Sequence, residues 1–205
     1  MDLHEALTQI SEIRQHVART ETYRGFRAAP VAFSGVVACA AAIFQAVFIH
    51  DPAANLPLYL GLWVGSAVGC LIFTGITMYW HCLKSSSTLT RSNTLLAIGN
   101  FAPSVVGGGL VTIVLFQIDA PCQWMLPGLW AIFFSFGVFS IYRLLPRATF
   151  GIGAFYMLAG VFSLIWARDA HAFSPWAMGV PFGVGQMVAA GIFYWTLERN
   201  SDDDQ

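Results

Sequence analysis

Residues 94–118 read TLLAIGNFAPSVVGGGLVTIVLFQI and contain no Asp, Glu, Lys, Arg or His. An α-helix needs about 20 apolar residues to cross a hydrocarbon core of about 30 Å. In hydrocarbon every backbone N–H and C=O group must be satisfied within the spanning structure, and a helix does this inside one segment. This stretch therefore predicts a transmembrane helix.

Five further uncharged stretches lie on either side of this one. The complete set is residues 28–49, 58–80, 94–118, 125–142, 149–166 and 177–196. Charged residues make up 10% of the chain, against about 25% in a typical soluble domain, and they gather between the stretches. Because the connections are short, consecutive helices should be antiparallel neighbours. We predict an all-α polytopic membrane bundle of six transmembrane helices, arranged as three helical hairpins.

The ten Lys and Arg residues predict the orientation of these helices. Arg168 lies on one side of the predicted spans, and the rest lie on the other: Arg14, Arg19, Arg24, Arg27, Lys84, Arg91, Arg143, Arg147 and Arg199. Basic residues favour the cytoplasmic side, so both termini should be cytoplasmic. The charged start is unlike a cleavable signal peptide, and the short loops are typical of a prokaryotic inner, or plasma, membrane.

The chain divides into three predicted parts. Residues 1–27 form a cytoplasmic amphipathic N-terminal helix, residues 28–196 the six-helix transmembrane domain, and residues 197–205 an acidic cytoplasmic tail. In the first part Asp2 and Glu5 have the spacing of a capping box. Apolar side chains then recur every three or four residues on one helical face, at Leu3, Leu7, Ile10, Ile13 and Val17. This face could pack on the membrane domain, the inner leaflet, a second copy of the chain or a cytosolic protein.

A pattern recurs three times in the transmembrane part. Each predicted hairpin has an aspartate in its outer turn, at Asp51, Asp119 and Asp169. A glycine follows nine or ten residues later, in Gly61-Leu62-Trp63, in Gly128-Leu129-Trp130 and at Gly179. Internal repeats are common in membrane proteins, although similar apolar hairpins can also arise by chance.

The arrangement of six spans, with glycines and aromatic residues placed in hairpins, is similar in outline to one group of small bacterial membrane proteins. These are built from repeated two-helix units, as in the HdeD-type acid-resistance family. The likeness covers the six spans and implies a repeated helical-hairpin fold. It is an analogy of architecture, so it assigns no functional residue.

Residue types that carry chemistry are scarce. The middle of each span lacks ionisable groups, which argues against a proton-coupled pump or a haem held between helices. His4 and Glu5 are not followed by histidine at position 8, which is Thr8, so a zinc-protease motif is broken. No phosphate-binding loop or serine-nucleophile motif is present, and no basic patch interleaved with aromatics indicates nucleic-acid binding. We expect no enzymatic activity, cofactor, metal or nucleic-acid partner; membrane lipid is the expected surrounding.

The predicted outer turns contain the main polar cluster, which consists of His50, Asp51, Asp119, Asp169 and His171. Imidazole and carboxylate groups can bind transition metals, and histidine protonation can sense acid. Short loops also need polar, turn-forming residues, and this interpretation is the favoured one.

Within the spans the notable polar residues are Asn100, Gln186 and Gln45. Asn100 is close to Pro103 and Gly107, and Gln186 is close to Pro181. These residues could line a substrate path, or they could serve interhelical packing with amide hydrogen bonds.

Two functional hypotheses follow. The first is a non-enzymatic multi-pass membrane component that forms a homo-oligomer or binds a cytosolic protein through the Leu3, Leu7, Ile10, Ile13 and Val17 face. The second is a small-molecule channel or transporter with a path beside the third and sixth spans.

Overall fold

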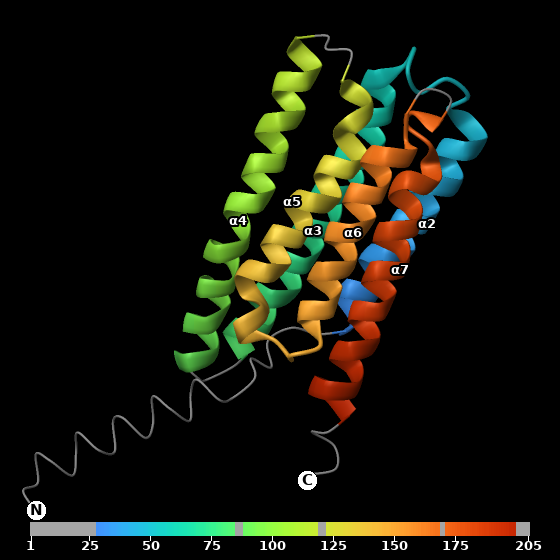
Figure 1. The fold of residues 1–205 in the computed structure, drawn as a ribbon. Coiled ribbons are helices and arrows are strands. Elements are labelled where there is room, and N and C mark those ends of the chain that lie inside the picture. The colour runs from blue at the N-terminus through green and yellow to red at the C-terminus, as the bar shows by residue number, and fades with distance from the viewer. Residues whose placement is uncertain (1–27, 85–87, 119–121, 169–170, 200–205) are drawn as a thin grey trace, which may run out of the picture.

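The computed structural model describes residues 28–84, 88–118, 122–168 and 171–199, and every regular element in these residues is a helix (Figure 1). The long helices are α2 (Ala28–Phe48), α3 (Leu56–Lys84), α4 (Thr88–Gln117), α5 (Leu126–Ile141), α6 (Thr149–Trp166) and α7 (Pro175–Phe193). Short turns flank some of them, namely η1 (Gln123–Met125), η2 (Tyr142–Leu144) and the π-helical η4 (Tyr194–Arg199). The predicted N-terminal helix and most of the acidic tail fall outside the described residues.

Six segments are long and apolar enough to cross a membrane, as the sequence predicts. They are Ala28–Phe48, Leu56–Trp80, Ser92–Gln117, Gln123–Leu144, Thr149–Trp166 and Pro175–Thr196. The helices α3 and α4 extend further than the predicted apolar stretches, to Lys84 and from Thr88. Charge limits how much of a helix lies in hydrocarbon, but backbone hydrogen bonding continues past that boundary. Within the described residues, the prediction of an all-α fold with six helices long and apolar enough to cross a membrane is confirmed.

The packing of the helices does not simply follow chain order. The most extensive contacts join α2 to α7 and α5 to α6, followed by those of α4 with α5 and α2 with α3. In Figure 1 the first and last helices, blue and red, lie side by side, and α4 stands at the opposite edge of the bundle. The direct contact between α3 and α4 is slight, although they are consecutive. The bundle is therefore closed by the contact between α2 and α7 and is open between α3 and α4.

Glycines make the two closest helix contacts possible. Between α5 and α6, a Cβ atom built on Gly128 would lie 2.8 Å from the carbonyl oxygen of Gly160, and one on Gly160 would lie 2.7 Å from that of Gly128. Between α7 and α2, a Cβ atom on Gly179 would lie 2.4 Å from the Cβ of Ala42. Small residues let helix backbones approach closely, which is how transmembrane helices associate without a hydrophobic driving force.

Helix α3 exposes apolar side chains and packs its more polar face against the bundle, which is the reverse of the usual arrangement in a soluble protein. Its packed face carries Tyr59 and Trp63, followed by the half-buried Ser66 and Thr74. Its outward face is apolar and exposed along the whole span, with Leu58, Val68, Ile72 and Ile76. Such a surface is unfavourable in water but matches the acyl chains of a bilayer.

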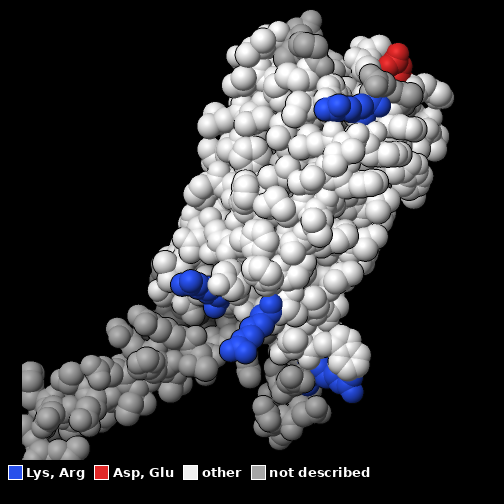
Figure 2. Space-filling model, in the orientation of Figure 1, with Lys and Arg blue, Asp and Glu red and all other residues white. Residues whose placement is uncertain are grey.

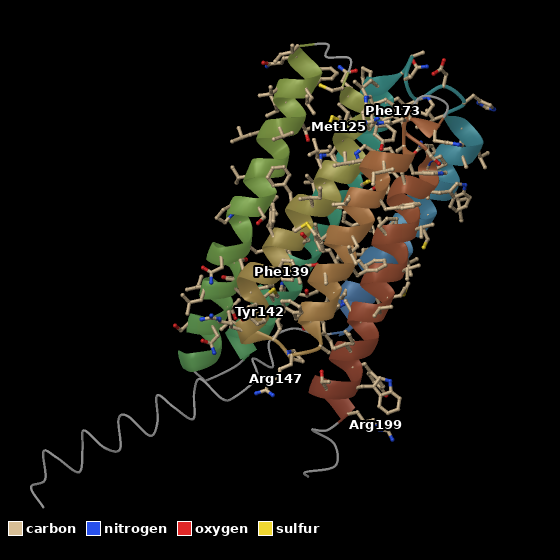
Figure 3. The ribbon with its side chains drawn as sticks, viewed as in Figure 1. Met125, Phe139, Tyr142, Arg147, Phe173 and Arg199 are labelled. Atoms are coloured by element: carbon tan, nitrogen blue, oxygen red, sulfur yellow. The ribbon has the colours of Figure 1, made fainter. Side chains whose placement is uncertain are left out.

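Charged side chains lie near the two ends of the described bundle (Figure 2). Figure 3 places Arg147 and Arg199 at one end, and Met125 and Phe173 near the other. Helix α2 begins and helix α7 ends at the Arg147 end, so the two described chain ends lie together (Figure 1). An even number of crossings requires this arrangement.

Candidate functional site

A buried polar contact ties three parts of the chain together near one end of the bundle. Gln45 of α2 is fully buried, and its Nε2 donates a 2.7 Å hydrogen bond to the carbonyl oxygen of Phe173, just before α7. Its Oε1 accepts a 2.7 Å hydrogen bond from Nε1 of Trp63 in α3. Both ends of the amide are thus used, so Gln45 joins α2, α3 and the turn that leads into α7.

Aromatic rings surround this contact. Tyr59 is fully buried, its ring stacks on Trp130 at 6.4 Å, and it meets the Phe173 ring edge-on at 4.9 Å. The Tyr59 hydroxyl has no hydrogen-bond partner among the described residues. Phe173 has a φ of 56°, which is uncommon for a side chain of this size and costs on the order of 1–3 kcal/mol. The Gln45 hydrogen bond and the buried ring hold Phe173 in this conformation.

A second indole makes a similar contact in the next pair of helices. Nε1 of Trp130 in α5 donates a 2.8 Å hydrogen bond to Oγ1 of Thr112 in α4, and that hydroxyl donates to the carbonyl oxygen of Gly108. In both contacts the tryptophan lies 18 residues after its acceptor. In the third pair of helices, α6 and α7, the corresponding polar residue is Ser163. The position 18 residues after it is Pro181, which has no N–H to donate. The buried Ser163 hydroxyl has no partner among the described residues.

A buried tyrosine and a half-buried glutamine lie close together between α6 and α7. Tyr156 is fully buried against Phe134, Phe155 and Phe182. The Gln186 amide is close enough to influence the Tyr156 hydroxyl, but that hydroxyl meets no described partner at hydrogen-bonding geometry. It fits against α7 because position 185 is glycine: a Cβ there would lie 2.6 Å from the hydroxyl oxygen.

The residues predicted to line a path lie in two separate places. Asn100 and Pro103 are exposed on α4, which packs on α5, and Gly107 of the same helix packs against the Phe133 ring. Pro181 and the half-buried Gln186 belong to α7, which packs mainly on α2. The structure therefore places the two halves of the predicted path on different sides of α5.

The described members of the predicted outer cluster are engaged separately. The Asp51 carboxylate accepts a 3.1 Å hydrogen bond from the backbone N–H of Ala54, as a turn-forming aspartate does. The His171 ring stacks on Trp166 at 4.6 Å, and His50 is exposed. Within the described residues, no three His, Cys, Asp or Glu side chains are placed to hold a metal ion. Asp119 and Asp169 lie outside the described residues, as does the predicted partner-binding face of Leu3, Leu7, Ile10, Ile13 and Val17.

No family model, no curated protein and no solved structure matches this chain. The outline likeness to repeated-hairpin bacterial membrane proteins therefore has no sequence or structural match behind it.

Sequence reasoning noted Gln45 as a polar residue within a span but did not predict its partners. The available signal was the equal spacing from Gln45 to Trp63 and from Thr112 to Trp130. In both cases the indole N–H reaches back across a short turn to a polar side chain on the preceding helix.

Proposed function

We propose that this chain is a non-enzymatic multi-pass component of a prokaryotic plasma membrane that self-associates or binds a cytosolic protein through its N-terminal apolar face. Both termini are cytoplasmic in this proposal. The observation that supports the structural part of this proposal is the environment of Gln45: among the described residues this fully buried amide uses both of its polar atoms to bond Trp63 and Phe173. An amide whose hydrogen bonds are all made within the bundle holds helices together, and this role is expected in a structural membrane protein.

The proposal includes three helical hairpins that derive from one repeated unit. The equal 18-residue spacing of the two indole contacts supports this. So do the glycine contacts, because the Gly61, Gly128 and Gly179 positions follow the repeated aspartates, and two of them meet a neighbouring helix at close range. The third hairpin departs from the pattern at Pro181, and the unpartnered Ser163 hydroxyl marks that departure.

Deleting residues 1–20 tests the proposed association. In detergent, the truncated chain should form a smaller particle than the full chain, or recover less of a bound partner. The mass of the protein component, measured by light scattering with size-exclusion chromatography, reports this. Replacing Leu7 and Ile13 with serine is a milder second variant that leaves the chain length unchanged. A particle of unchanged mass and composition in both variants contradicts the proposal.

A channel or transporter is the second candidate, because Pro103 and Pro181 lie inside α4 and α7, each within about one helical turn of glycines. Proline removes a backbone hydrogen bond, and glycine lets the helix bend there. Single cysteines placed along 107–112 and 183–191, in a chain with its native cysteines replaced by alanine, test this candidate. If no position reacts with a water-soluble thiol reagent, the path does not exist.

The same reagent, applied from outside the cell in a form that cannot cross the membrane, tests the orientation. Ala54→Cys and Ala148→Cys are matched because both sites are exposed turn positions at opposite ends of the bundle. We expect Ala54→Cys to react and Ala148→Cys to react only after the membrane is opened. The reverse result would place the termini outside.

A further inference from the structure

Three helical hairpins arranged in a ring meet at three hairpin–hairpin contacts. In this chain two of these contacts are closely packed. The α5·α6 contact joins the second hairpin to the third, and the α7·α2 contact joins the third to the first. The remaining contact, between α3 of the first hairpin and α4 of the second, is slight. The open side of the bundle is therefore the α3–α4 contact, which is equivalent in the repeat to the two contacts that are closely packed.

The two close contacts use equivalent positions of the repeat. Gly128 meets Gly160, which lies nine residues before Asp169, and Gly179 meets Ala42, which lies nine residues before Asp51. By the same rule Gly61 of α3 should meet Leu110 of α4, which lies nine residues before Asp119. All of these positions lie toward the outer end of their helices, so the pairing is consistent in depth.

The third contact, between Gly61 and Leu110, is not formed within the chain. No described atom lies within 4 Å of a Cβ built at Gly61, nor at Gly65 or Gly69, one and two turns further along α3. On α4, Leu110 and Val106 are each 58% exposed. Helix α7 carries the same spacing of glycines, at Gly179 and Gly183, and α2 fills it with Ala42 and Cys39. The glycine row of α3 is thus the same kind of groove without its helix.

Both helices are fastened to the rest of the bundle on their other sides. Helix α4 is held to α5 by the Thr112–Trp130 hydrogen bond and by the Phe101 ring over Gly137, where a Cβ would lie 2.6 Å from the ring. Helix α3 is held to α2 by Trp63 and Gln45. Closing the gap inside one chain would break such contacts, whereas a second copy offers both missing faces without breaking them.

We propose that α3 of one copy packs against α4 of a second copy, with Gly61 facing Leu110 on each side of a two-fold axis. A two-fold interface presents the same surface on both subunits, so one chain supplies the glycine groove and the apolar ridge to its partner and receives the same in return. The Asn100 amide is exposed on α4, where hydrocarbon would leave it without a partner. A neighbouring helix from the partner provides groups with which this amide can bond.

This interface rests on the proposal that the chain self-associates, adds a second contact surface to the N-terminal face, and is tested by disulfide cross-linking. Two differently tagged chains, with native cysteines replaced by alanine, are produced together in membranes. One carries Gly61→Cys and the other Leu110→Cys. We expect oxidation to give a covalent dimer that contains both tags. Phe162→Cys replaces Gly61→Cys in the control, because Phe162 is exposed near the outer end of α6. The control should give no covalent dimer. Gly65→Cys with Val106→Cys is a second pair, one turn further from the outer end.

Three results would overturn the inference. One is a disulfide that forms within a single chain when Gly61→Cys and Leu110→Cys are combined in it, while the separately tagged chains give no mixed dimer. Another is the absence of mixed dimers with both pairs while light scattering still finds an oligomer, in which case only this interface fails. The third is a particle of one copy in detergent and in lipid nanodiscs, in which case the self-association itself fails.

Discussion

Replacing Gly160 with alanine should loosen α6 from α5. The added Cβ would lie 2.7 Å from the carbonyl oxygen of Gly128 and 2.7 Å from Cγ1 of Ile132. Backbone cannot move aside as a flexible side chain can, so the helices must separate and lose contact along their length. Overpacking of this kind costs about 1–3 kcal/mol. Unfolding of the detergent-solubilised protein, followed by the loss of helical circular dichroism in SDS titrations, measures the change.

Gly151→Ala is the matched control, because it lies in the same helix and no described atom would come within 4 Å of its Cβ. Alanine is a better helix former than glycine by up to about 1 kcal/mol, so this variant should be as stable as the parent or slightly more stable. Equal stability of the Gly160→Ala and Gly151→Ala variants would show that α5 and α6 do not approach as closely as the structure has them.

Replacing Gln45 with alanine should destabilise the end of the bundle that contains Phe173. The change removes both hydrogen bonds of the amide and leaves the Trp63 N–H and the Phe173 carbonyl oxygen buried without a partner. Each orphaned group costs about 1–3 kcal/mol in soluble proteins, but interhelical hydrogen bonds in membranes average nearer 0.6 kcal/mol. With the cavity left by the side chain, we expect a loss of about 2–4 kcal/mol.

Gln117→Ala removes the same side chain from an exposed position at the end of α4 and should change stability little. Trp63→Phe breaks only one of the two hydrogen bonds and should fall between the two glutamine variants. The same SDS titration serves for all three. If the Gln45→Ala and Gln117→Ala variants unfold at the same SDS concentration, the buried amide does not hold α2, α3 and the turn before α7 together.

The sequence predicts the helices of this fold well, because the signal for a transmembrane helix is local. Residues 149–166 are bounded by charge and by turn residues, and the helix has those limits. Where prediction and structure differ, as at the Lys84 end of α3 and the Thr88 end of α4, the helix continues beyond the hydrocarbon boundary that the sequence predicts.

The contacts between helices are largely beyond sequence reasoning. Gly179 and Ala42 are far apart in the chain, and nothing in the local pattern of either pairs them. Gln45 is recognisable as a buried polar residue, but one of its two partners is the carbonyl oxygen of Phe173, and a backbone acceptor carries no sequence signature. Periodicity indicates which face of a helix is apolar, but in a membrane both lipid and neighbouring helices meet apolar faces. The path and outer-cluster residues were predicted from residue type alone, so they remain predictions.

The pairing of α2 with α7 has a consequence for biogenesis. A chain enters the bilayer in order of synthesis, so α2 is inserted first and α7 last. Until Pro175–Phe193 emerges, the groove around Gly35 and Ala42 faces lipid or a temporary companion. The contact between α2 and α7 therefore forms only after the contacts among α2 to α6 have become possible. A nascent chain that stops before α7 leaves its first helix without the neighbour that it contacts most.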